Sequence, residues 1–496
     1  MNTLNLEILS AKQMKKADML AVEKSKIRSF ELMDNAGKAV ASIITKEFKC
    51  GKALILCGPG NNGGDGFVTA FYLRQKGWDV IVKLLISVDS IKGDALIALD
   101  RLGKENISSF DDISDAKDCN LVIDAIFGTG LSRNIQERLI TCFEEVSKLN
   151  APILAIDMPS GISADNGKIL GKALKCKRTV TFFRKKIGQL LFPGSAYCGK
   201  IDVIDIGIPS EVISKFKFMV KENAPSLWLE SYPRLKKDFH KYDRGHVIVV
   251  AGLKSSLGAS RLSARAALRL GAGLVTLACN KDNIDPIISN TTSEMAAEYR
   301  NINDFRKIIS EKRVSSVLIG PGCGNGEETR IKVEAVLEIC KFAVLDADAL
   351  TAFEMFPDRL LKQLNSNKIL TPHLGEFKRL FPDIYEEGKD IKTMAEEAAK
   401  KSGAVILLKS SAGVIASPQG EIVINTNTTP YLATAGSGDV LAGMIASLVG
   451  DDKMRAFEGA CAGSWIHGEA GKLFGPGLVS EDLEKMIPRV LSNILL

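Results

Sequence analysis

The sequence predicts a two-domain α/β protein, and three of its features lead to this fold class. Its 496 residues exceed what a single hydrophobic core usually organises. Short apolar runs rich in β-branched residues alternate with helical patterns in both halves of the chain. Between the halves, residues 215–239 lose this alternation and contain two prolines. We therefore expect one domain over residues 1–222 and a second over residues 223–496.

The first half contains six strand-like runs. Each is mostly apolar at odd and even positions alike, which is typical of a strand covered on both faces of its sheet. Helical stretches such as residues 67–77 lie between several of the runs, so we expect a parallel, doubly wound sheet. The runs cover residues 53–58, 79–86, 120–128, 152–161, 178–183 and 200–209.

The second half repeats this arrangement with six further runs. An alanine-rich helix that ends at a glycine is predicted over residues 263–273. The motifs of the two halves differ, so we do not infer an internal duplication. The runs cover residues 245–252, 273–279, 315–322, 342–348, 368–373 and 404–417.

The composition argues against several classes of protein. The net charge of +6 is small for this length, and two aspartates interrupt the densest basic segment, residues 234–244, so we expect no nucleic-acid partner. Ten scattered cysteines and four histidines show no metal-like spacing, which predicts reduced thiols, no zinc site and a cytoplasmic location. We recognise no signal peptide and no membrane-spanning run, so we expect no membrane partner.

The segment GPGNNGGDG, residues 58–66, follows a predicted strand and precedes a predicted helix. Glycines at such a turn let backbone N–H groups face a ligand, and the N-terminus of a helix favours an anion. The spacing matches neither of the common nucleotide-binding glycine motifs. A tight connection in which Asn62 or Asp65 caps the helix explains the segment equally well.

Two further strand ends favour ligand binding. Asp124 ends one strand and is followed by the glycine loop FGTGLSRN, and Asp157 ends another strand before MPSG. Ligands of open parallel sheets bind beyond the carboxyl ends of the strands, so three polar loops at three such ends predict one pocket. Three independent helix caps are the alternative.

Six motifs, in order along the first half, resemble one family. The resemblance is to the N-terminal domain of the bifunctional NAD(P)H-hydrate repair enzymes, and it covers nearly all of residues 1–222. It implies a Rossmann-like fold and an epimerase acting on NAD(P)HX, the hydrated form of the reduced nicotinamide cofactors. The motifs are LMDNAG (32–37), GPGNNGGDG (58–66), DAIFGTGL (124–131), DMPSGI (157–162), TVTFFRKKIG (179–188) and DIGIP (205–209).

This resemblance implies a set of site residues. Asn62, Asp124 and Ser160 would bind K⁺ through oxygen atoms, the hard donors that such an ion accepts. Asp157 would contact the nicotinamide ring as catalytic acid or base, and Lys186 would assist it, although a solvated surface lysine is an equal alternative. Two segments would contact the diphosphate and ribose of the substrate: Asn61, Asn62, Gly63, Gly64 and Asp65, and Gly128, Thr129, Gly130, Leu131, Ser132, Arg133 and Asn134.

In the second half, the segment ATAGSGDVLAG, residues 433–443, places small residues before a single carboxylate and an apolar stretch. A bare backbone beside a carboxylate suggests an anion site with an acid or base next to it. With five other motifs, this segment resembles the C-terminal domain of the same enzymes, a ribokinase-like α/β/α domain that dehydrates NAD(P)HX with ADP. The other motifs are HKYDRGHVIVVAG (240–252), SSLGASRLSARAALRLGAGLV (255–275), IGPGCG (319–324), LDADAL (345–350) and TPHLGEF (371–377).

The second resemblance also implies roles. Asp439 would take a proton from the substrate hydroxyl, with helix capping as the alternative, and ADP would arrive with Mg²⁺. His373 would contact the substrate, although a buried structural histidine is the usual case, and we expect His467 to be helix packing. Asp439, Ala259 and Gly322 complete the substrate contacts. The nucleotide would contact Lys409, Ser410, Ser411, Ala412, Gly413 and Gly438.

The chain departs from this family at two places. The usual K-G after the strand ending at Lys409 is here Lys409-Ser410, and the usual G-G-T-G-D is A-G-S-G-D. Ser437 keeps a hydroxyl and Ala435 is small, so we expect the anion pocket to persist and the nucleotide preference to be affected most. The competing functions are a small-molecule kinase with a non-catalytic N-terminal binding domain and an interaction scaffold. We also expect a homo-oligomer.

Overall fold

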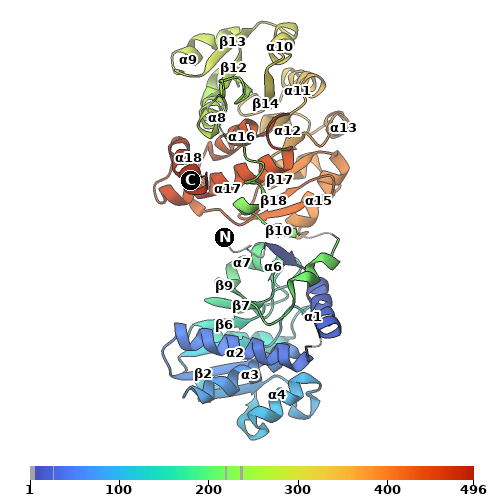
Figure 1. The fold of residues 1–496 in the computed structure, drawn as a ribbon, viewed down its shortest axis with the longest axis vertical. Coiled ribbons are helices and arrows are strands. Elements are labelled where there is room, and N and C mark those ends of the chain that lie inside the picture. The colour runs from blue at the N-terminus through green and yellow to red at the C-terminus, as the bar shows by residue number, and fades with distance from the viewer. Residues whose placement is uncertain (1–5, 26, 218–219, 235–237, 496) are drawn as a thin grey trace. The chain divides into compact units, whose positions relative to one another are not determined.

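Figure 1 shows the fold in a computed structural model, which describes residues 6–25, 27–217, 220–234 and 238–495. The chain forms two compact units, Met1–Val220 and Lys221–Leu496. Each is an α/β unit built on a mainly parallel sheet, which confirms the predicted fold class. Among the residues described, no helix is both long enough and apolar enough to cross a membrane.

The first unit is built on a sheet of seven strands: β2 (Lys52–Cys57), β3 (Asp79–Leu84), β4 (Ile107–Ser109), β5 (Leu121–Ala125), β6 (Ile153–Ile156), β7 (Arg178–Phe182) and β9 (Lys200–Ile204). Neighbouring strands are parallel, in the order β4-β3-β2-β5-β6-β7-β9. Counted from β2, this is the doubly wound order, and the direction of winding reverses between β2 and β5. The predicted sheet is therefore confirmed.

The helices of this unit are α1 (Ala11–Ser25), α2 (Ser29–Glu47), α3 (Asn61–Gln75), α4 (Asp94–Leu102), α5 (Glu137–Lys148), α6 (Ile187–Leu190) and α7 (Ser195–Cys198). A hydrophobic core lies between these helices and each face of the sheet. Alternate residues of β2 point to opposite faces, so they contribute to different cores. Ala53, Ile55 and Cys57 pack in the core that contains α2 and α3, whereas Leu54 and Leu56 pack in the core that contains α5.

A short ladder holds the segment that follows β7. Strand β1 (Glu7–Leu9) pairs in parallel with β8 (Lys185–Lys186), and Leu9 lies opposite Lys186. Gln189 on α6 accepts a hydrogen bond from the Lys186 backbone N–H at 2.8 Å and donates to the Asp157 carbonyl at 2.7 Å. Lys186 therefore has a fixed backbone position beside the end of β6.

The second unit contains the strands β11 (His246–Val250), β12 (Leu274–Asn280), β13 (Met295–Tyr299), β14 (Val314–Ile319), β15 (Ala343–Leu345), β16 (Lys368–Leu370), β17 (Val405–Leu408), β18 (Gly413–Ala416) and β19 (Ile422–Asn425). Their order is β13-β12-β11-β14-β15-β16-β17-β18-β19. Pairing is parallel from β13 to β17 and antiparallel beyond it. The short strand β10 (Val220–Glu222) lies at the division between the units.

The helices of the second unit are α8 (Leu257–Leu270), α9 (Ile284–Ile288), α10 (Ile302–Ile309), α11 (Glu327–Ile339), α12 (Asp348–Thr351), α13 (Pro357–Leu361), α14 (Leu374–Leu380), α15 (Ile391–Ser402), α16 (Ser437–Leu448), α17 (Ala456–Phe474) and α18 (Ser480–Leu495). Residues of α8, α16, α17 and α18 share one core. A Cβ on Gly443 of α16 would lie 2.1 Å from the Ser263 carbonyl of α8, so only glycine allows this close approach.

Two predicted boundaries are wrong. The segment NNGGDG was expected as a loop before a helix, but α3 begins at Asn61 and includes it. The run 404–417 forms two antiparallel strands, β17 and β18, with Lys409–Ala412 between them. In the first case close backbone packing outweighs the low helix propensity of glycine.

Candidate active sites

The glycines of the β2–α3 connection allow three backbone segments to meet. A Cβ on Gly63 would lie 2.0 Å from the Gly58 carbonyl oxygen, and a Cβ on Gly58 would lie 1.9 Å from the Ile126 carbonyl oxygen. The N-cap of α3 is Gly60, which has no side chain to accept hydrogen bonds from the N–H groups of the first turn. The helix N-terminus thus presents N–H groups and positive potential where the winding of the sheet reverses, which suits an anion.

Asp157, directly after β6, is held in an uncommon conformation. Its φ is +64°, in the left-handed region that non-glycine residues seldom adopt. Oδ1 accepts a hydrogen bond from the Thr181 hydroxyl at 3.1 Å and pairs with Lys186 Nζ at 2.7 Å, and Oδ2 accepts from the Thr129 N–H at 3.0 Å. Three segments of the chain therefore fix this carboxylate.

The Lys186 side chain is completely buried. Besides pairing with Asp157, its Nζ donates to the Thr181 hydroxyl at 2.6 Å and to the Phe182 carbonyl at 3.1 Å. The alternative of a solvated surface lysine is wrong. A buried ammonium with this geometry holds the negative charge of Asp157 in place.

Asn62 and Gly128 lie next to Asp157. A Cβ on Gly128 would be 2.7 Å from Asp157 Oδ2 and 3.1 Å from Asn62 Oδ1, so these groups surround one point. Both polar atoms of the Asn62 side chain are buried without a hydrogen-bond partner among the described residues. Because buried polar atoms are nearly always hydrogen-bonded, the unpaired amide of Asn62 indicates a ligand or ion as its partner.

Asp124 and Ser160 form a second, fully buried group. Asp124 Oδ1 accepts from the Ser160 hydroxyl at 2.5 Å and Oδ2 from the Ser160 N–H at 2.7 Å, while the Ile126 N–H reaches Oδ1 at 3.2 Å. Burial raises the pKa of Asp124 to about 6 and outweighs these hydrogen bonds, which lower it. The Asp124 carboxylate, the Ser160 hydroxyl and the Asn62 amide oxygen are hard oxygen donors of the kind that K⁺ accepts, and no described distance joins Asn62 to the other two.

Two more carboxyl groups face the Asp157–Lys186 pair. Burial raises the pKa of Asp18 on α1 to about 7, with Lys186 lowering it and Asp157 raising it. Burial also raises the pKa of Asp65 well above its usual range, and Asp157 and Asp18 add to that shift. Asp65 was predicted and Asp18 was missed. The sequence feature that identifies Asp18 is its position on the same face of α1 as the buried residues Met14, Ala17 and Ala21.

In the loop after β5 that was predicted to contact the substrate, the remaining residues are largely exposed to solvent. Ser132, Arg133 and Asn134 are exposed, and a Cβ on Gly130 would meet nothing within 4 Å. Asn61, at the start of α3, is exposed as well. No described contact joins these residues to Asp157.

The second cluster lies at the start of α16. Gly436 is the N-cap with φ +85°, and Asp439 is the third residue of the helix, so the N-cap alternative for Asp439 is wrong. Burial, with smaller contributions from Asp346 and Asp348, raises the pKa of Asp439 to about 6 against the lowering effect of Lys409. This carboxyl group can therefore change its protonation state near neutral pH.

Lys409 brings a positive charge to this helix end. Its Nζ pairs with Asp346 Oδ1 at 2.7 Å, and Asp346 also accepts from the Thr371 hydroxyl at 2.7 Å. A Cβ on Gly438 would lie 3.5 Å from Lys409 Nζ and 3.9 Å from Asp346 Oδ2. Lys409 and Gly438, both predicted to contact the nucleotide, therefore lie close together. Asp346 lies beside them; it belongs to the motif LDADAL but was not predicted as a site residue.

His373 caps α14 instead of lying in the core. Its Nδ1 accepts from the N–H groups of Gly375 and Glu376, and its side chain is 57 % exposed. The alternative of a buried histidine is wrong. Glu376, also missed from the sequence, is buried, and burial raises its pKa while Lys409 lowers it and Asp346 raises it.

His467 on α17 contacts the start of α16. Its Nε2 lies 3.2 Å from the Ser437 hydroxyl and 3.0 Å from the Ser437 carbonyl. Complete burial lowers the pKa of His467 to about 4, so the ring is neutral at physiological pH. The predicted packing role is confirmed, and the packing fixes the turn that precedes Asp439.

The remaining predicted residues lie around this cluster. Ala259 is on α8, where its carbonyl accepts from Ser263, whose hydroxyl also reaches the Asp439 carbonyl at 2.9 Å. Gly322, with φ +70°, follows β14 and packs against Ser256. Ser410 and Ser411 are exposed between β17 and β18, Ala412 is buried, and Gly413 begins β18.

The fold and these clusters define a two-domain α/β enzyme with one candidate active site in each unit. The family model described as YjeF-related protein N-terminus matches residues 29–188, and the model described as NAD(P)H-hydrate dehydratase matches residues 247–489. Relatives named bifunctional NAD(P)H-hydrate repair enzyme include one from Moorella thermoacetica, 34% identical over 98% of this chain and 97% of the relative. Another, from Thermofilum pendens, is 32% identical over 98% and 96%.

The chain belongs to the family of bifunctional NAD(P)H-hydrate repair enzymes. It is an enzyme with an epimerase domain followed by a dehydratase domain, and a small-molecule kinase is not favoured. A solved structure of ADP/ATP-dependent NAD(P)H-hydrate dehydratase from Bacillus subtilis, co-crystallised with ATP and Mg²⁺, is 25% identical, with a TM-score of 0.48. The match covers 55% of this chain and 97% of the Bacillus subtilis chain.

Proposed function

We propose that this chain repairs hydrated NADH and NADPH by two reactions, one at each cluster. The first unit interconverts R- and S-NAD(P)HX, and the second dehydrates S-NAD(P)HX at the expense of ADP, giving NAD(P)H, AMP and phosphate. The observation that carries the proposal is a carboxylate beside each of two helix N-termini in one chain: Asp157, next to Asn62 in the first turn of α3, and Asp439, in the first turn of α16. We assign the enzyme to the cytoplasm, as a homo-oligomer without a nucleic-acid partner.

In the first unit, Asp157 is the catalytic acid or base at the nicotinamide ring. Exchange of the two epimers breaks the C6–O bond with loss of water and re-forms it when water adds to the other face, so it is aided by a group that protonates the departing hydroxyl and takes a proton from the incoming water. The ion pair with buried Lys186 and the hydrogen bonds from Thr129 and Thr181 support this role, because they hold the carboxylate in one orientation. The segments 61–65 and 128–134 contact the diphosphate and ribose of the substrate.

K⁺ fits the oxygen donors of Asn62, Asp124 and Ser160, which would hold it beside the first site. When bound, it supplies positive charge close to the substrate. The unpartnered amide of Asn62 is the observation that supports this assignment.

In the second unit, Asp439 is the general base. It takes the proton of the C6 hydroxyl, whose oxygen attacks the terminal phosphate of ADP and displaces AMP. Phosphate then leaves C6, which is far easier than expelling hydroxide, and loss of a proton from C5 to solvent re-forms the C5–C6 double bond. Ala259, Gly322 and His373 contact the hydrated cofactor in this arrangement.

Lys409 and the N-terminus of α16 neutralise the transferring phosphate. Lys409 Nζ lies 3.5 Å from the Cβ position of Gly438, which puts its charge beside the N–H groups of the first turn. Residues 409–413 and Gly438 form the ADP site. Mg²⁺ bound with the nucleotide would supply further charge neutralisation, and Asp346, whose Oδ2 lies 3.9 Å from the Cβ position of Gly438, is a carboxylate that would hold it.

The test is to incubate the purified full chain with a mixture of NADHX epimers, with and without ADP. Absorbance at the reduced-nicotinamide band should recover only with ADP and should continue after the S form is consumed, because the R form is converted. A kinase would instead accumulate a stable phosphorylated product, visible by ³¹P NMR. That outcome, or recovery without any nucleotide, would contradict the proposal.

A further inference from the structure

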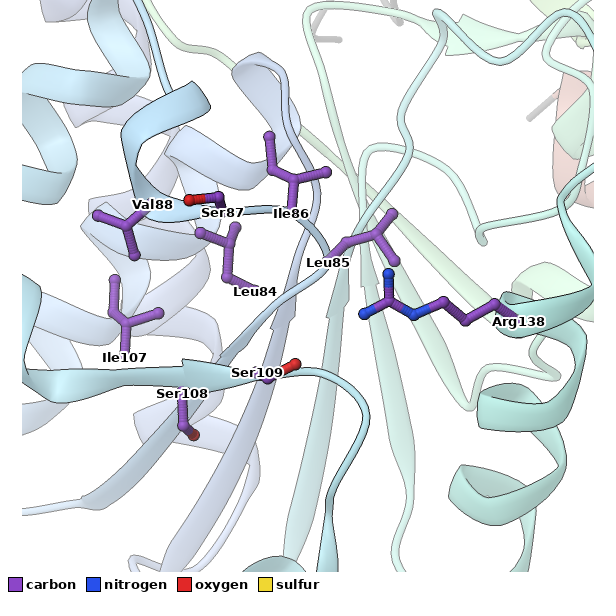
Figure 2. Close-up of a pocket in the computed structure, with 9 residues that line it drawn as sticks. All are labelled: Leu84, Leu85, Ile86, Ser87, Val88, Ile107, Ser108, Ser109 and Arg138. Carbon is purple, nitrogen blue, oxygen red and sulfur yellow. The ribbon is translucent and has the colours of Figure 1, made fainter.

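The cavity drawn in Figure 2 is bordered by an ion pair of the protein itself. Its volume is about 280 Å³, and it is lined by the end of β3, the segment after that strand, β4 and Arg138 of α5. The Arg138 guanidinium is paired with both carboxylate oxygens of Asp111. Its charge is therefore neutralised within the protein, and we assign no ligand to this cavity.

In the second unit, residues 434–437 form a β-turn directly before α16. Gly436 has φ +85° and ψ −10°, close to the values of the third residue of a type II turn, and the Ser437 N–H donates to the Thr434 carbonyl at 3.4 Å. A type I turn differs by a reversal of the middle peptide group, which here contains the Ala435 carbonyl and the Gly436 N–H. The turn type therefore decides which way these two groups point.

Buried side chains from three helices hold carbonyl groups of this turn and of the first turn of α16. The helices are α18, α17 and α8, and the carbonyls belong to the alternate positions 435, 437 and 439. The contacts join Ser480 Oγ to the Ala435 carbonyl at 2.5 Å, His467 Nε2 to the Ser437 carbonyl at 3.0 Å, and Ser263 Oγ to the Asp439 carbonyl at 2.9 Å. The direction of each carbonyl is thus set by a separate helix.

The contact with the Ser437 carbonyl assigns the proton of the His467 ring. Burial lowers the pKa of His467 to about 4, so the ring is neutral at physiological pH and carries one N–H group. A carbonyl oxygen can only accept a hydrogen bond, so that proton is on Nε2. Nε2 therefore donates, and it cannot also take the proton of the Ser437 hydroxyl, which lies 3.2 Å away.

Holding a carbonyl group also fixes the N–H group that follows it. In a trans peptide bond, the C=O and the next N–H lie in one plane and point in opposite directions. Ser480 therefore directs the Gly436 N–H away from α18, and in the same way His467 directs the Gly438 N–H away from α17. Gly438 lies beside Lys409, and the Nζ of Lys409 is 3.5 Å from the Cβ position of Gly438. Both N–H groups thus have a set direction at the proposed ADP site.

We propose that Ser480 and His467 are positioning residues of the dehydratase. They aim the N–H groups of Gly436 and Gly438 at the phosphate that passes from ADP to the hydrated cofactor. The inference rests on the proposed function of the second unit. Donors that are already aligned stabilise the charge of the transition state without reorganisation. Loss of this alignment therefore lowers kcat more than it raises KM for ADP.

The experiment removes each donor and compares it with a hydroxyl elsewhere on α16. Ser480→Ala and His467→Leu remove the two hydrogen bonds, whereas His467→Gln keeps an N–H donor on the side chain. Ser447→Ala is the matched control, because the buried Ser447 hydroxyl donates to the Met444 carbonyl of its own helix at 2.8 Å. Recovery of NADH from S-NADHX gives kcat and KM for ADP, below the temperature at which thermal unfolding of each variant begins.

We expect Ser480→Ala and His467→Leu to lower kcat about tenfold or more and to change KM for ADP less than about threefold, because removing one aligned donor costs about a hundredfold or more in such sites. His467→Gln should keep most of the wild-type kcat, and Ser447→Ala should match the wild type.

Equal kcat values for Ser480→Ala and Ser447→Ala, or for His467→Gln and His467→Leu, would overturn the inference and leave the dehydratase assignment intact. A rise in KM for ADP that exceeds the fall in kcat would do the same. Failure of the wild-type chain to recover NADH from S-NADHX with ADP would instead reject the assignment itself.

Discussion

Asp439 has the acid–base properties that its proposed role requires. A general base works best when its pKa lies near the working pH, and burial raises the pKa of this carboxyl to about 6. The neighbouring His467 has a pKa lowered to about 4 by burial, so it is neutral above pH 5 and does not titrate in the same range. Burial also raises the pKa of Glu376 in the same cluster, so a change in dehydratase rate near pH 6 is assigned to Asp439 when Glu376→Gln retains that change.

We expect kcat/KM of the dehydratase to fall about tenfold per pH unit well below pH 6, because only the ionised form of Asp439 accepts a proton. Asp439→Asn should abolish ADP-dependent recovery of NADH and leave epimer exchange unchanged. The same variant should raise Tm at pH 8. The pKa of Asp439 is raised on folding, so its ionised form opposes folding above pH 6, and this cost disappears as the pH falls. A flat pH profile between 5 and 7 would remove Asp439 from the chemistry.

Lys186 illustrates a residue whose role depends on burial. Replacing one partner of a buried ion pair leaves the other charge uncompensated, at a cost of about 3–5 kcal/mol. We expect Lys186→Met to lower the free energy of unfolding of the first unit by about that amount and to slow epimer exchange, measured by denaturant titration and by chromatography. Lys172→Met, which removes a surface pair with Glu144, is the control and should change the free energy of unfolding by at most about 1 kcal/mol.

At the scale of elements, α3 and α16 position the two sites through close backbone contacts. Helix α3 begins within a glycine-rich segment because Gly63 lies against Gly58, whose own Cβ position is filled by the Ile126 carbonyl. This contact sets the distance between the N-terminus of α3 and the loop after β5. A methyl group at position 63 would push the N-terminus of α3 and the loop after β5 apart.

We expect Gly63→Ala to weaken epimer exchange at least about tenfold, because misplacing substrate-positioning groups by about 1 Å can cost about a hundredfold in rate. Gly60→Ala is a matched control in the same motif, since a Cβ there would meet nothing within 4 Å. Dehydratase activity, measured with S-NADHX and ADP, should be unchanged in both variants. Equal epimerase rates for the two variants would show that the contact does not position the site.

The sequence predicts those parts of the fold and sites that depend on local patterns. Apolar runs followed by a carboxylate and glycines identify β5 and β6 with Asp124 and Asp157, because strand, turn and functional group are adjacent in the chain. Contacts between distant segments are not visible in such patterns. The capping of the α16 turn by His467, and the burial of Asp18 beside Lys186, both depend on tertiary packing.

The start of α3 was mispredicted for a related reason. Local propensity places glycines in a loop, whereas the helix is stabilised by its packing against the sheet and by the tight approach of backbones that glycine permits. The candidate site residues in this segment were found nonetheless, because a glycine-rich strand end indicates ligand binding whether or not the helix has already begun.

At the scale of the whole molecule, each unit has its own hydrophobic core and its own candidate site. The proposed reactions are consecutive, because the epimerase supplies the S form that the dehydratase consumes. Each cluster is built from residues of one unit, so the two sites should be separable by mutation. Asp157→Ala should stop the first reaction and Asp439→Asn the second.

Mixing these two variants should restore complete repair of an epimer mixture. Asp157→Ala with ADP should convert the S form and then slow to the spontaneous rate of epimer exchange, whereas Asp439→Asn should exchange the epimers and form no NADH. In the mixture, S-NADHX released by one molecule diffuses to the intact dehydratase of another, so absorbance of NADH should rise to completion. The rate should follow the concentration of each intact site. A mixture that stalls where Asp157→Ala alone stalls would show that the S form must pass between sites of one chain.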